Sequence, residues 1–214
     1  MEIKRKMKLE KIQFITHQNS KYNYLESAKL ALENGIRFIQ LRMKNASKED
    51  IVSLGKIIRK ECDKYNATLI IDDYVELVSE IGADGVHLGK MDMSIDKARE
   101  ILGENKIIGG TANSFEDILL HYNKGANYIG LGPFRFTNTK EVLSPILGLE
   151  GYKEIIDKCK EKNITIPIYA IGGIRLEDLN SIKEIGVYGI AISSIILDSE
   201  NPISCTKKIL DFSK

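Results

Sequence analysis

The stretch Gly82-Ala83-Asp84-Gly85-Val86-His87-Leu88-Gly89-Lys90-Met91-Asp92 joins a turn, a short apolar strand, a glycine loop and a carboxylate. Its first half, a glycine and then an apolar run, recurs at residues 35–41, 125–131 and 186–192. Each glycine can end a helix, and each run is typical of a strand buried on both faces. Polar residues follow every run at once. A repeated unit with polar residues past each strand predicts a closed barrel with its site on one face.

Length and composition indicate one globular domain. The chain has 214 residues, of which 43% are hydrophobic, and a net charge of +1. This supports a single large core, and we expect residues 1–11 to be an N-terminal extension and residues 12–214 to form the domain. The near-zero charge argues against nucleic acid or an anionic membrane as the main partner.

Cysteine use and hydropathy indicate the compartment. Cys62, Cys159 and Cys205 are scattered singly, without the spacing of a disulfide framework or a Cys-x-x-Cys motif. The apolar runs are far shorter than a membrane span, and residues 12–16 are too few for the core of a signal peptide. We therefore expect a cytoplasmic protein.

Apolar runs and helical spacing alternate along the chain. The runs predict strands at residues 12–17, 36–41, 67–71, 84–88, 106–109, 127–131, 166–171 and 187–192. Capping residues and apolar spacing predict helices at residues 24–34, 47–65, 74–81, 94–102, 114–124, 150–162, 176–185 and 202–212. The pattern is that of an α/β protein with a single (β/α)8 TIM barrel. An open doubly wound sheet is the alternative, which the lack of Gly-x-Gly-x-x-Gly after the first strand weakens.

Two basic residues, Arg42 and Lys44, follow the second expected strand. Alternation along a strand could place both on one side, where a guanidinium and an ammonium group would clamp a phosphate or pyrophosphate. The alternative is a charged turn that points into solvent.

Acidic residues follow the third and fourth expected strands: Asp72 and Asp73, then Asp92. Because neighbouring barrel strands bring their loops together, two of these carboxylates can hold Mg²⁺, which takes its other ligands from water and substrate phosphates. The alternative is that Asp72 or Asp73 caps a helix that begins near Tyr74.

A third set of residues fits anion binding. Thr137-Asn-Thr-Lys140 lies in the longest irregular stretch, residues 132–148, while Gly172-Gly173 and Ser193-Ser194 follow strands seven and eight. The loops after these two strands often form the phosphate site of a barrel. The alternative is a tight turn and two caps. Together, the polar sets imply two phosphorylated substrates, or one substrate with two phosphates.

The histidines give no catalytic pattern. His17, His87 and His121 lack metal-ligand spacing, and no Gly-x-Ser-x-Gly is present. We expect His87 to be a strand residue whose hydrogen bonds are satisfied in the core, and His17 could line a pocket.

Four motifs in order resemble thiamine phosphate synthase from about Ile12 to Leu210. They are Gln40-Leu-Arg-Met-Lys44, Gly85-Val-His-Leu-Gly89 with Asp92, Thr137-Asn-Thr-Lys140, and Ala170-Ile-Gly-Gly-Ile174. The resemblance implies a transferase on a (β/α)8 barrel that joins hydroxymethylpyrimidine diphosphate to thiazole phosphate, giving thiamine phosphate and pyrophosphate. Its partners are these small molecules, and the sequence leaves a homo-oligomer open.

The resemblance also implies residue roles. Asp73 and Asp92 would hold Mg²⁺ as the cofactor, while Arg42, Lys44 and Lys140 would be catalytic by stabilising the leaving pyrophosphate. The diphosphate substrate would bind to Gln40, Arg42, Lys44, Asp72, Thr111 and Lys140. The thiazole phosphate would bind to Thr137, Thr139, Gly173, Ser193 and Ser194.

The chain departs from the family at a few positions. The family usually has Asn-Asp-Arg where this chain has Asp72-Asp73-Tyr74. It usually has Gln where this chain has Lys90, and often Ser where this chain has Thr111. We expect Lys90 either to neutralise the extra carboxylate of Asp72 or to face the diphosphate while Asp72 holds it in place. The alternative is that Lys90 points into solvent and Asp72 caps a helix.

Two other functions fit the same barrel. One is a thiazole tautomerase, which would need an acid–base residue and no metal. The tautomerases with this barrel lack the Thr-x-Thr-Lys loop that residues 137–140 retain. The other is a non-catalytic sensor that binds a phosphorylated ligand.

Overall fold

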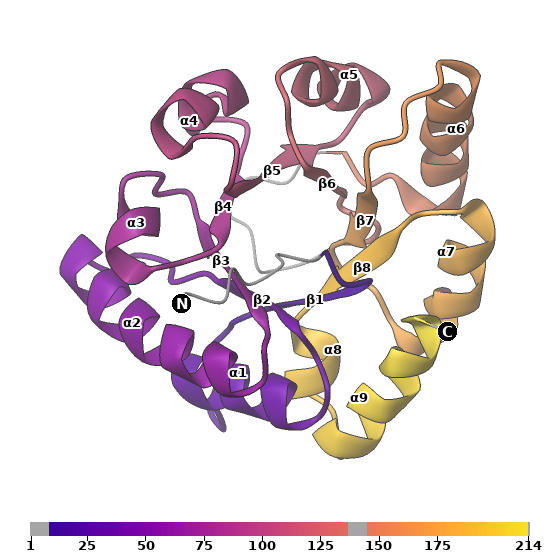
Figure 1. Cartoon of the computed structure of the whole chain (residues 1–214). Helices are drawn as coiled ribbons and strands as arrows, with labels where there is room; N and C mark the ends of the chain where they lie inside the picture. The colour runs from indigo at the N-terminus through magenta and orange to yellow at the C-terminus, as the bar shows by residue number, and fades with distance from the viewer. Residues whose placement is uncertain (1–8, 137–144, 214) are drawn as a thin grey trace.

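The computed structural model describes residues 9–136 and 145–213. Eight parallel strands close into a barrel in the order β1 to β8, which confirms the (β/α)8 expectation (Figure 1). The strands are β1 (Ile12–Ile15), β2 (Phe38–Leu41), β3 (Thr68–Asp72), β4 (Gly85–Leu88), β5 (Ile107–Ala112), β6 (Tyr128–Leu131), β7 (Ile168–Ile171) and β8 (Gly189–Ile192).

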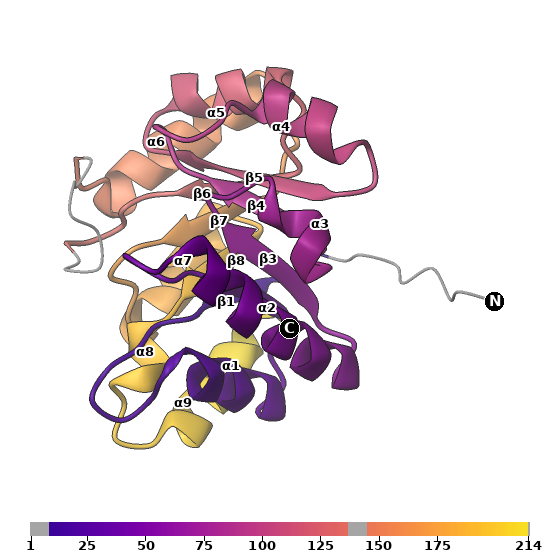
Figure 2. The same ribbon diagram turned by 90° about the vertical axis from the view of Figure 1, so that its left-hand side faces the viewer.

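Helices surround the strands on the outside, as Figures 1 and 2 show from two directions. They are α1 (Tyr24–Glu33), α2 (Lys48–Lys64), α3 (Leu77–Ile81), α4 (Ile95–Leu102), α5 (Phe115–Asn123), α6 (Gly148–Glu161), α7 (Leu179–Ile185), α8 (Ser194–Leu197) and α9 (Pro202–Leu210), with 3₁₀ turns η1 (Leu176–Asp178) and η2 (Asp211–Ser213). The expected helix at 176–185 is split into η1 and α7, and the one at 74–81 begins only at Leu77.

Polar caps fix where several helices begin. The side chain of Asn23 accepts a hydrogen bond from the backbone N–H of Glu26, whose side chain accepts from Asn23, and Ser114 forms the same reciprocal box with Asp117. Such boxes satisfy backbone donors that have no partner within the helix. Because α5 begins three residues after the end of β5, the Ser114 box also fixes the short loop that follows Thr111 and Ala112.

The interior of the barrel holds a layer of aromatic rings. Phe38, Tyr128 and Tyr169 pack edge to face, with ring centroids 5.4–5.8 Å apart. Gly109 makes this layer possible, because a Cβ atom at that position would overlap the ring of Tyr128. The apolar cluster that contains these three rings fills the inside of the barrel. A second and larger apolar core lies between the strands and the outer helices.

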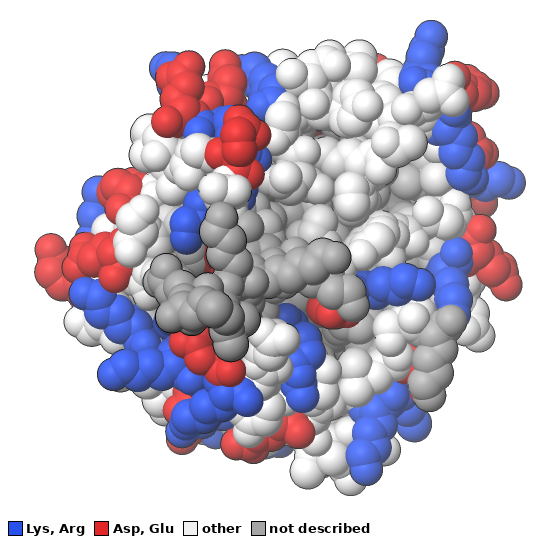
Figure 3. Space-filling model, in the orientation of Figure 1, with Lys and Arg blue, Asp and Glu red and all other residues white. Residues whose placement is uncertain are grey.

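The outer surface carries charges of both signs around its edge (Figure 3). This agrees with the nearly balanced composition of the chain. In residues 9–136 and 145–213, no helix is both long and apolar enough to cross a membrane. The first strand begins at Ile12, as expected, and residues 1–8 of the expected extension lie outside the described residues.

Candidate active site

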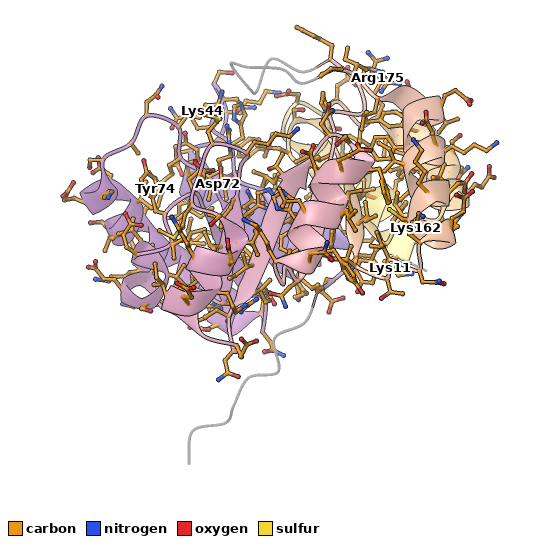
Figure 4. All side chains as sticks on the ribbon, turned by 90° about the horizontal axis from the view of Figure 1, so that it is seen from above. Lys11, Lys44, Asp72, Tyr74, Lys162 and Arg175 are labelled. Atoms are coloured by element: carbon orange, nitrogen blue, oxygen red, sulfur yellow. The ribbon has the colours of Figure 1, made fainter. Side chains whose placement is uncertain are left out.

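A cavity of about 470 Å³ opens at the C-terminal end of the barrel, lined by residues at or just after the ends of all eight strands. Figure 4 shows Lys44 and Arg175, which follow β2 and β7, along one edge of the molecule, whereas Lys11 and Lys162 lie nearer the other. Parallel strands bring their carboxyl ends to the same rim, so residues distant in sequence converge there.

The cavity brings together most of the expected site residues, namely Gln40, Arg42, Asp72, Asp73, Asp92, Thr111, Gly173, Ser193 and Ser194. Lys44 is different: its side chain is exposed and lies farther out than Asp72, at the rim (Figure 4). Thr137, Thr139 and Lys140 lie outside the described residues.

Asp72 lies between two donors from β2 and the residue that follows it. Its Oδ2 atom is 2.9 Å from Arg42 Nε, and its Oδ1 atom accepts a hydrogen bond of 2.6 Å from Gln40 Nε2. The carboxylate is therefore neutralised by Arg42 and held in place by Gln40. It does not cap a helix, because α3 begins five residues later with Glu76 at its N-cap position.

The expected pairing of Lys90 with Asp72 is wrong. Lys90 lines the cavity, but its Nζ atom lies 2.6 Å from Oδ2 of Asp117 at the start of α5. Asp72 is instead paired with Arg42, which is nearer in the barrel because β2 and β3 are hydrogen-bonded neighbours. Lys90 is exposed, as the alternative expected, but its ammonium group pairs with the first turn of α5 instead of ending free in solvent. That Lys90 faces the diphosphate stays a prediction.

Asp73 and Asp92 form a pair of carboxyl groups on one side of the cavity. Burial, the charge of Asp72 and a hydrogen bond with Asp92 raise the pKa of Asp73 to about 8. The backbone of Asp73 has a left-handed φ of 66°, and its N–H donates to His87 O at 2.9 Å. Asp92 Oδ2 accepts a hydrogen bond of 2.6 Å from Gly89 N. Two carboxyl groups are thus fixed against each other by the backbone.

This carboxyl pair fits a magnesium ion. Burial and then repulsion from neighbouring carboxylates raise the pKa of Asp73, and the positive charge of a divalent cation bound by Asp73 and Asp92 would oppose both effects. The described part of the chain contains no group of three or more His, Cys, Asp or Glu residues arranged to hold a metal. Mg²⁺ needs no such group, because it binds through one or two carboxylates together with water and substrate phosphates.

The loops after β7 and β8 form the opposite side of the cavity. Gly172 and Gly173 have left-handed φ angles of 93° and 67°, and a Cβ atom on Gly173 would lie 2.9 Å from Phe136 O. Arg135 holds this loop, since its guanidinium donates to Gly173 O at 2.8 Å and to both carboxylate oxygens of Asp178. The two glycines thus let this loop pack closely against the segment that follows β6, at the edge of the cavity that both glycines line.

Ser193 adds a buried hydroxyl group to this side. Its Oγ atom is shielded from solvent and forms no hydrogen bond within the described residues. Burying a hydroxyl without a partner costs free energy, so an oxygen-rich ligand in the cavity would satisfy it. The tight turn and caps of the alternative reading do not account for this hydroxyl.

His87 is satisfied in the core, as expected, but it also reaches the cavity. Its Nε2 atom lies 2.9 Å from Thr111 Oγ1 and its Nδ1 atom 3.1 Å from Tyr128 Oη. Tyr128 also accepts a hydrogen bond of 3.1 Å from Gln13 Nε2. Sequence reasoning missed Gln13 and Tyr128, although a glutamine within the apolar first strand was a signal for a buried polar contact. His17 lines the cavity, as the sequence allowed.

The arrangement suits the binding and separation of negatively charged groups. One side offers Arg42 and a carboxyl pair for a cation, and the other offers the glycine loop after β7 and the hydroxyl of Ser193. Fixed charges and donors of this kind stabilise charge that develops during a reaction without having to reorganise.

Comparison with known proteins gives a consistent result. A family model described as thiamine monophosphate synthase matches residues 12–196. A thiamine-phosphate synthase of Bacteroides thetaiotaomicron is 54% identical over 203 residues, covering 95% of this chain and 97% of the relative. One from Flavobacterium johnsoniae is 53% identical over 200 residues, covering 94% of this chain and 92% of the relative.

Solved structures agree with the sequence relatives. The thiamine phosphate pyrophosphorylase of Pyrococcus furiosus superposes with a TM-score of 0.82 at 34% identity, covering 95% of each chain. The orotidine 5'-phosphate decarboxylase of Pyrococcus horikoshii has a TM-score of 0.66 at 16% identity, covering 94% of this chain and 98% of that one. At this low identity the second likeness shows only a shared fold.

Proposed function

The chain belongs to the thiamine monophosphate synthase family, and from this we propose that its cavity joins hydroxymethylpyrimidine diphosphate to thiazole phosphate. The products are thiamine phosphate and pyrophosphate, so the protein acts as a transferase. The observation that carries the proposal is the two-sided cavity, in which Arg42 and the carboxyl groups of Asp73 and Asp92 lie across from the loops that carry Gly173 and Ser193.

The diphosphate substrate is assigned to the side formed by β2 to β5. Arg42 and Thr111 line the cavity there and offer donors to phosphate oxygens, while Gln40 and Asp72 hold Arg42 in place. Lys44 and Lys140 are assigned to the same substrate from the family resemblance. Lys44 is exposed at the rim, so it would have to turn inward to reach the diphosphate.

Asp73 and Asp92 are the residues that would hold Mg²⁺, the proposed cofactor. When bound, the ion supplies positive charge that neutralises the diphosphate and its leaving group. Arg42 contributes to the same end through its guanidinium group, which matches the geometry of phosphate oxygens.

The thiazole phosphate is assigned to the side formed by the loops after β7 and β8. Gly173, Ser193 and Ser194 line the cavity there. Thr137 and Thr139 are assigned to the same phosphate from the resemblance. Binding on opposite sides would direct the thiazole nitrogen at the pyrimidine methylene carbon.

The chemistry proposed for this site depends on charge rather than on acid–base catalysis. Pyrophosphate departs before or as the thiazole nitrogen attacks, so negative charge grows on the leaving group. Arg42, together with Lys140 and Lys44, would stabilise that charge. His87 is engaged by Thr111 and Tyr128, which fits a structural rather than a proton-transferring role.

The compartment is part of the proposal. The three cysteines are free and buried, which is compatible with the reducing cytoplasm. We therefore place the reaction in the cytoplasm, where the small-molecule substrates would be its partners.

An assay of thiamine phosphate formation tests the proposal. The protein is incubated with both substrates, with and without Mg²⁺, alongside the variants Asp73→Asn and Asp92→Asn. Each variant removes one hard anionic ligand, so both should lose most activity at limiting Mg²⁺ while remaining folded. Asp157→Asn is the control, because Asp157 lies on the surface of α6, where it pairs with Lys160. Near-normal turnover in both site variants contradicts the metal assignment. No product under any condition contradicts the function and favours a tautomerase or a sensor.

A further inference from the structure

A chain of hydrogen bonds, buried in its middle and partly buried at its two ends, crosses the inside of the barrel from the Asp72 carboxylate to the Thr111 hydroxyl. Its links are Gln40 Nε2 to Asp72 Oδ1 at 2.6 Å, Gln13 Nε2 to Gln40 Oε1 at 3.0 Å, Gln13 Nε2 to Tyr128 Oη at 3.1 Å, Tyr128 Oη to His87 Nδ1 at 3.1 Å, and His87 Nε2 to Thr111 Oγ1 at 2.9 Å. Both ends line the cavity, whereas Gln13 and Tyr128 are 1% and 0% exposed.

The direction in which these hydrogen bonds are donated is fixed at the Asp72 end. Asp72 is ion-paired with Arg42, and an ionised carboxylate can only accept hydrogen bonds. Gln40 must therefore turn its NH₂ group to Asp72 and its oxygen to Gln13. Gln13 must in turn present its own NH₂ group, since two facing amide oxygens would repel each other.

The second hydrogen of the Gln13 amide continues the chain. It is donated to Tyr128 Oη, so the hydrogen of Tyr128 must go to another acceptor. Burial raises the pKa of Tyr128, which keeps its hydroxyl protonated. Among residues 9–136 and 145–213, the remaining partner of Tyr128 Oη is His87 Nδ1. A neutral imidazole that accepts at Nδ1 carries its hydrogen on Nε2, which then donates to Thr111.

We propose that Gln13, Tyr128 and His87 are positioning residues that orient the Thr111 hydroxyl with its hydrogen directed into the cavity. Thr111 Oγ1 accepts from His87, so its own hydrogen is available as a donor to an anionic oxygen of a ligand. The identity of that ligand, a diphosphate, rests on the proposed function. The direction of the hydrogen bonds does not.

If the hydrogen bonds were donated in the opposite direction, Thr111 would offer the cavity an acceptor instead of a donor. Thr111 would then donate to His87 Nε2 and offer only lone pairs to the cavity, which repel a phosphate oxygen. Tyr128 Oη would accept from both Gln13 and His87, and its own hydrogen would be buried without an acceptor. Such unsatisfied buried donors are rare in folded proteins because their desolvation is not compensated.

Nuclear magnetic resonance of ligand-free protein labelled with ¹⁵N-histidine tests the direction without reference to the reaction. The chain has three histidines. His121 serves as an internal reference, because its Nε2 lies 3.0 Å from the carbonyl oxygen of Thr111 and must be protonated. We expect His87 to carry its hydrogen on Nε2, with an unprotonated Nδ1 whose resonance shifts in Tyr128→Phe toward that of a nitrogen with no hydrogen bond.

Tyr169→Phe is the matched control for this shift. Tyr169 packs against Tyr128 in the same aromatic layer, but its hydroxyl donates to Glu10 O at 2.7 Å and takes no part in the chain. The Nδ1 resonance of His87 should be the same in Tyr169→Phe as in the unmodified protein. A hydrogen on His87 Nδ1, or a resonance that does not respond to Tyr128→Phe, overturns the proposal.

Binding of inorganic pyrophosphate in the presence of Mg²⁺ tests the consequence. Thr111→Val should weaken binding by roughly tenfold or more, as expected for a lost hydrogen bond to a charged group, and Thr111→Ser should restore it. Tyr128→Phe should weaken pyrophosphate binding by a smaller factor. Thr111→Val should weaken binding less when it is added to Tyr128→Phe than when it is made in the unmodified protein.

The outcomes separate this proposal from the proposed function. Fully additive effects of Tyr128→Phe and Thr111→Val mean that Tyr128 does not act through Thr111, which overturns the positioning role. Unchanged pyrophosphate binding in Thr111→Val, with the expected state of His87, removes the diphosphate from this side of the cavity. The assigned hydrogen-bond direction would then stand.

Discussion

Lys90 Nζ lies 2.6 Å from Oδ2 of Asp117, and this ion pair ties the loop after β4 to the first turn of α5. The same carboxylate accepts hydrogen bonds from the backbone N–H groups of Asn113 and Ser114. Lys90 therefore stabilises the capping box of α5 and, through it, the loop that follows Thr111. The pair is partly exposed, so its contribution to stability should be small.

The first prediction concerns this pair. A double-mutant cycle of Lys90→Gln and Asp117→Asn should give a coupling of roughly 0.2–1 kcal/mol in the free energy of unfolding, measured in urea. The cycle of Lys90→Gln and Asp72→Asn is the control and should be additive, because Asp72 is paired with Arg42. A larger coupling of Lys90 with Asp72 than with Asp117 would contradict the structure.

Ser193→Ala should separate stability from binding. The hydroxyl of Ser193 is buried and has no partner among residues 9–136 and 145–213, so its removal should leave the free energy of unfolding unchanged or raise it by about 1 kcal/mol. The affinity for thiazole phosphate should fall, as calorimetry would show.

Ser47→Ala is the matched control for that variant. Ser47 caps α2 by accepting from Asp50 N, far from the cavity in the chain. Its removal should cost roughly 1 kcal/mol of stability without affecting thiazole phosphate binding. If Ser193→Ala instead destabilises the protein and binds the ligand normally, Ser193 belongs to the core rather than to the site.

The stability of the metal-free protein should depend on pH through Asp73. Its pKa is raised from 3.8 to about 8, so between these values the folded protein binds more protons than the unfolded chain. Stability then falls as pH rises from about 4 to about 8, and is constant on either side of this window as far as this group is concerned. Thermal unfolding measured at several pH values in a chelator should show the decline.

Two further measurements check that assignment. Asp73→Asn removes the titrating group and should flatten the decline. Saturating Mg²⁺ should reduce it in the unmodified protein by favouring the ionised form. A decline of equal slope in Asp73→Asn would assign the effect to other groups.

Gly173→Ala should disrupt the phosphate side of the cavity. The left-handed φ of 67° costs a non-glycine residue roughly 1–3 kcal/mol, and the added Cβ atom would also lie 2.9 Å from Phe136 O. We expect lower stability and weaker thiazole phosphate binding. Gly186→Ala has a comparable φ of 92° but meets no atom within 4 Å, so it should lose stability alone. Equal effects of both variants on binding would rule out a specific role for Gly173.

The fold could be predicted because each barrel strand leaves a strong local signal. A parallel strand covered on both faces is a short apolar run, and the preceding glycine ends the helix before it. The main error was at β5, which extends to Ala112 rather than ending at Gly109. The strand was expected to end before Gly110, but both Gly109 and Gly110 belong to it, and they are small because the rings of Tyr128 and His121 lie where Cβ atoms would be.

The sequence could predict which loops come together to form the site, but not how their side chains pair. Topology brings the strand ends together, but it does not say which side chains pair across the gaps, and so Lys90 was assigned to Asp72 instead of Asp117. Lys44 was placed by strand alternation, which no longer applies because β2 ends at Leu41. The contacts of Gln13 and Tyr128 depend on positions 115 residues apart, which no local pattern reveals.

The fit between Gly109 and Tyr128 restricts how this protein could change by successive substitutions. Any larger residue at position 109 would collide with the tyrosine ring, so the ring would have to be replaced first. A smaller residue at position 128 would leave a void and would also sever the link between Gln13 and His87. Each order of steps therefore passes through an impaired intermediate. Gly109 thus helps to preserve the orientation of the Thr111 hydroxyl, because a single substitution at position 109 or at position 128 would impair the protein.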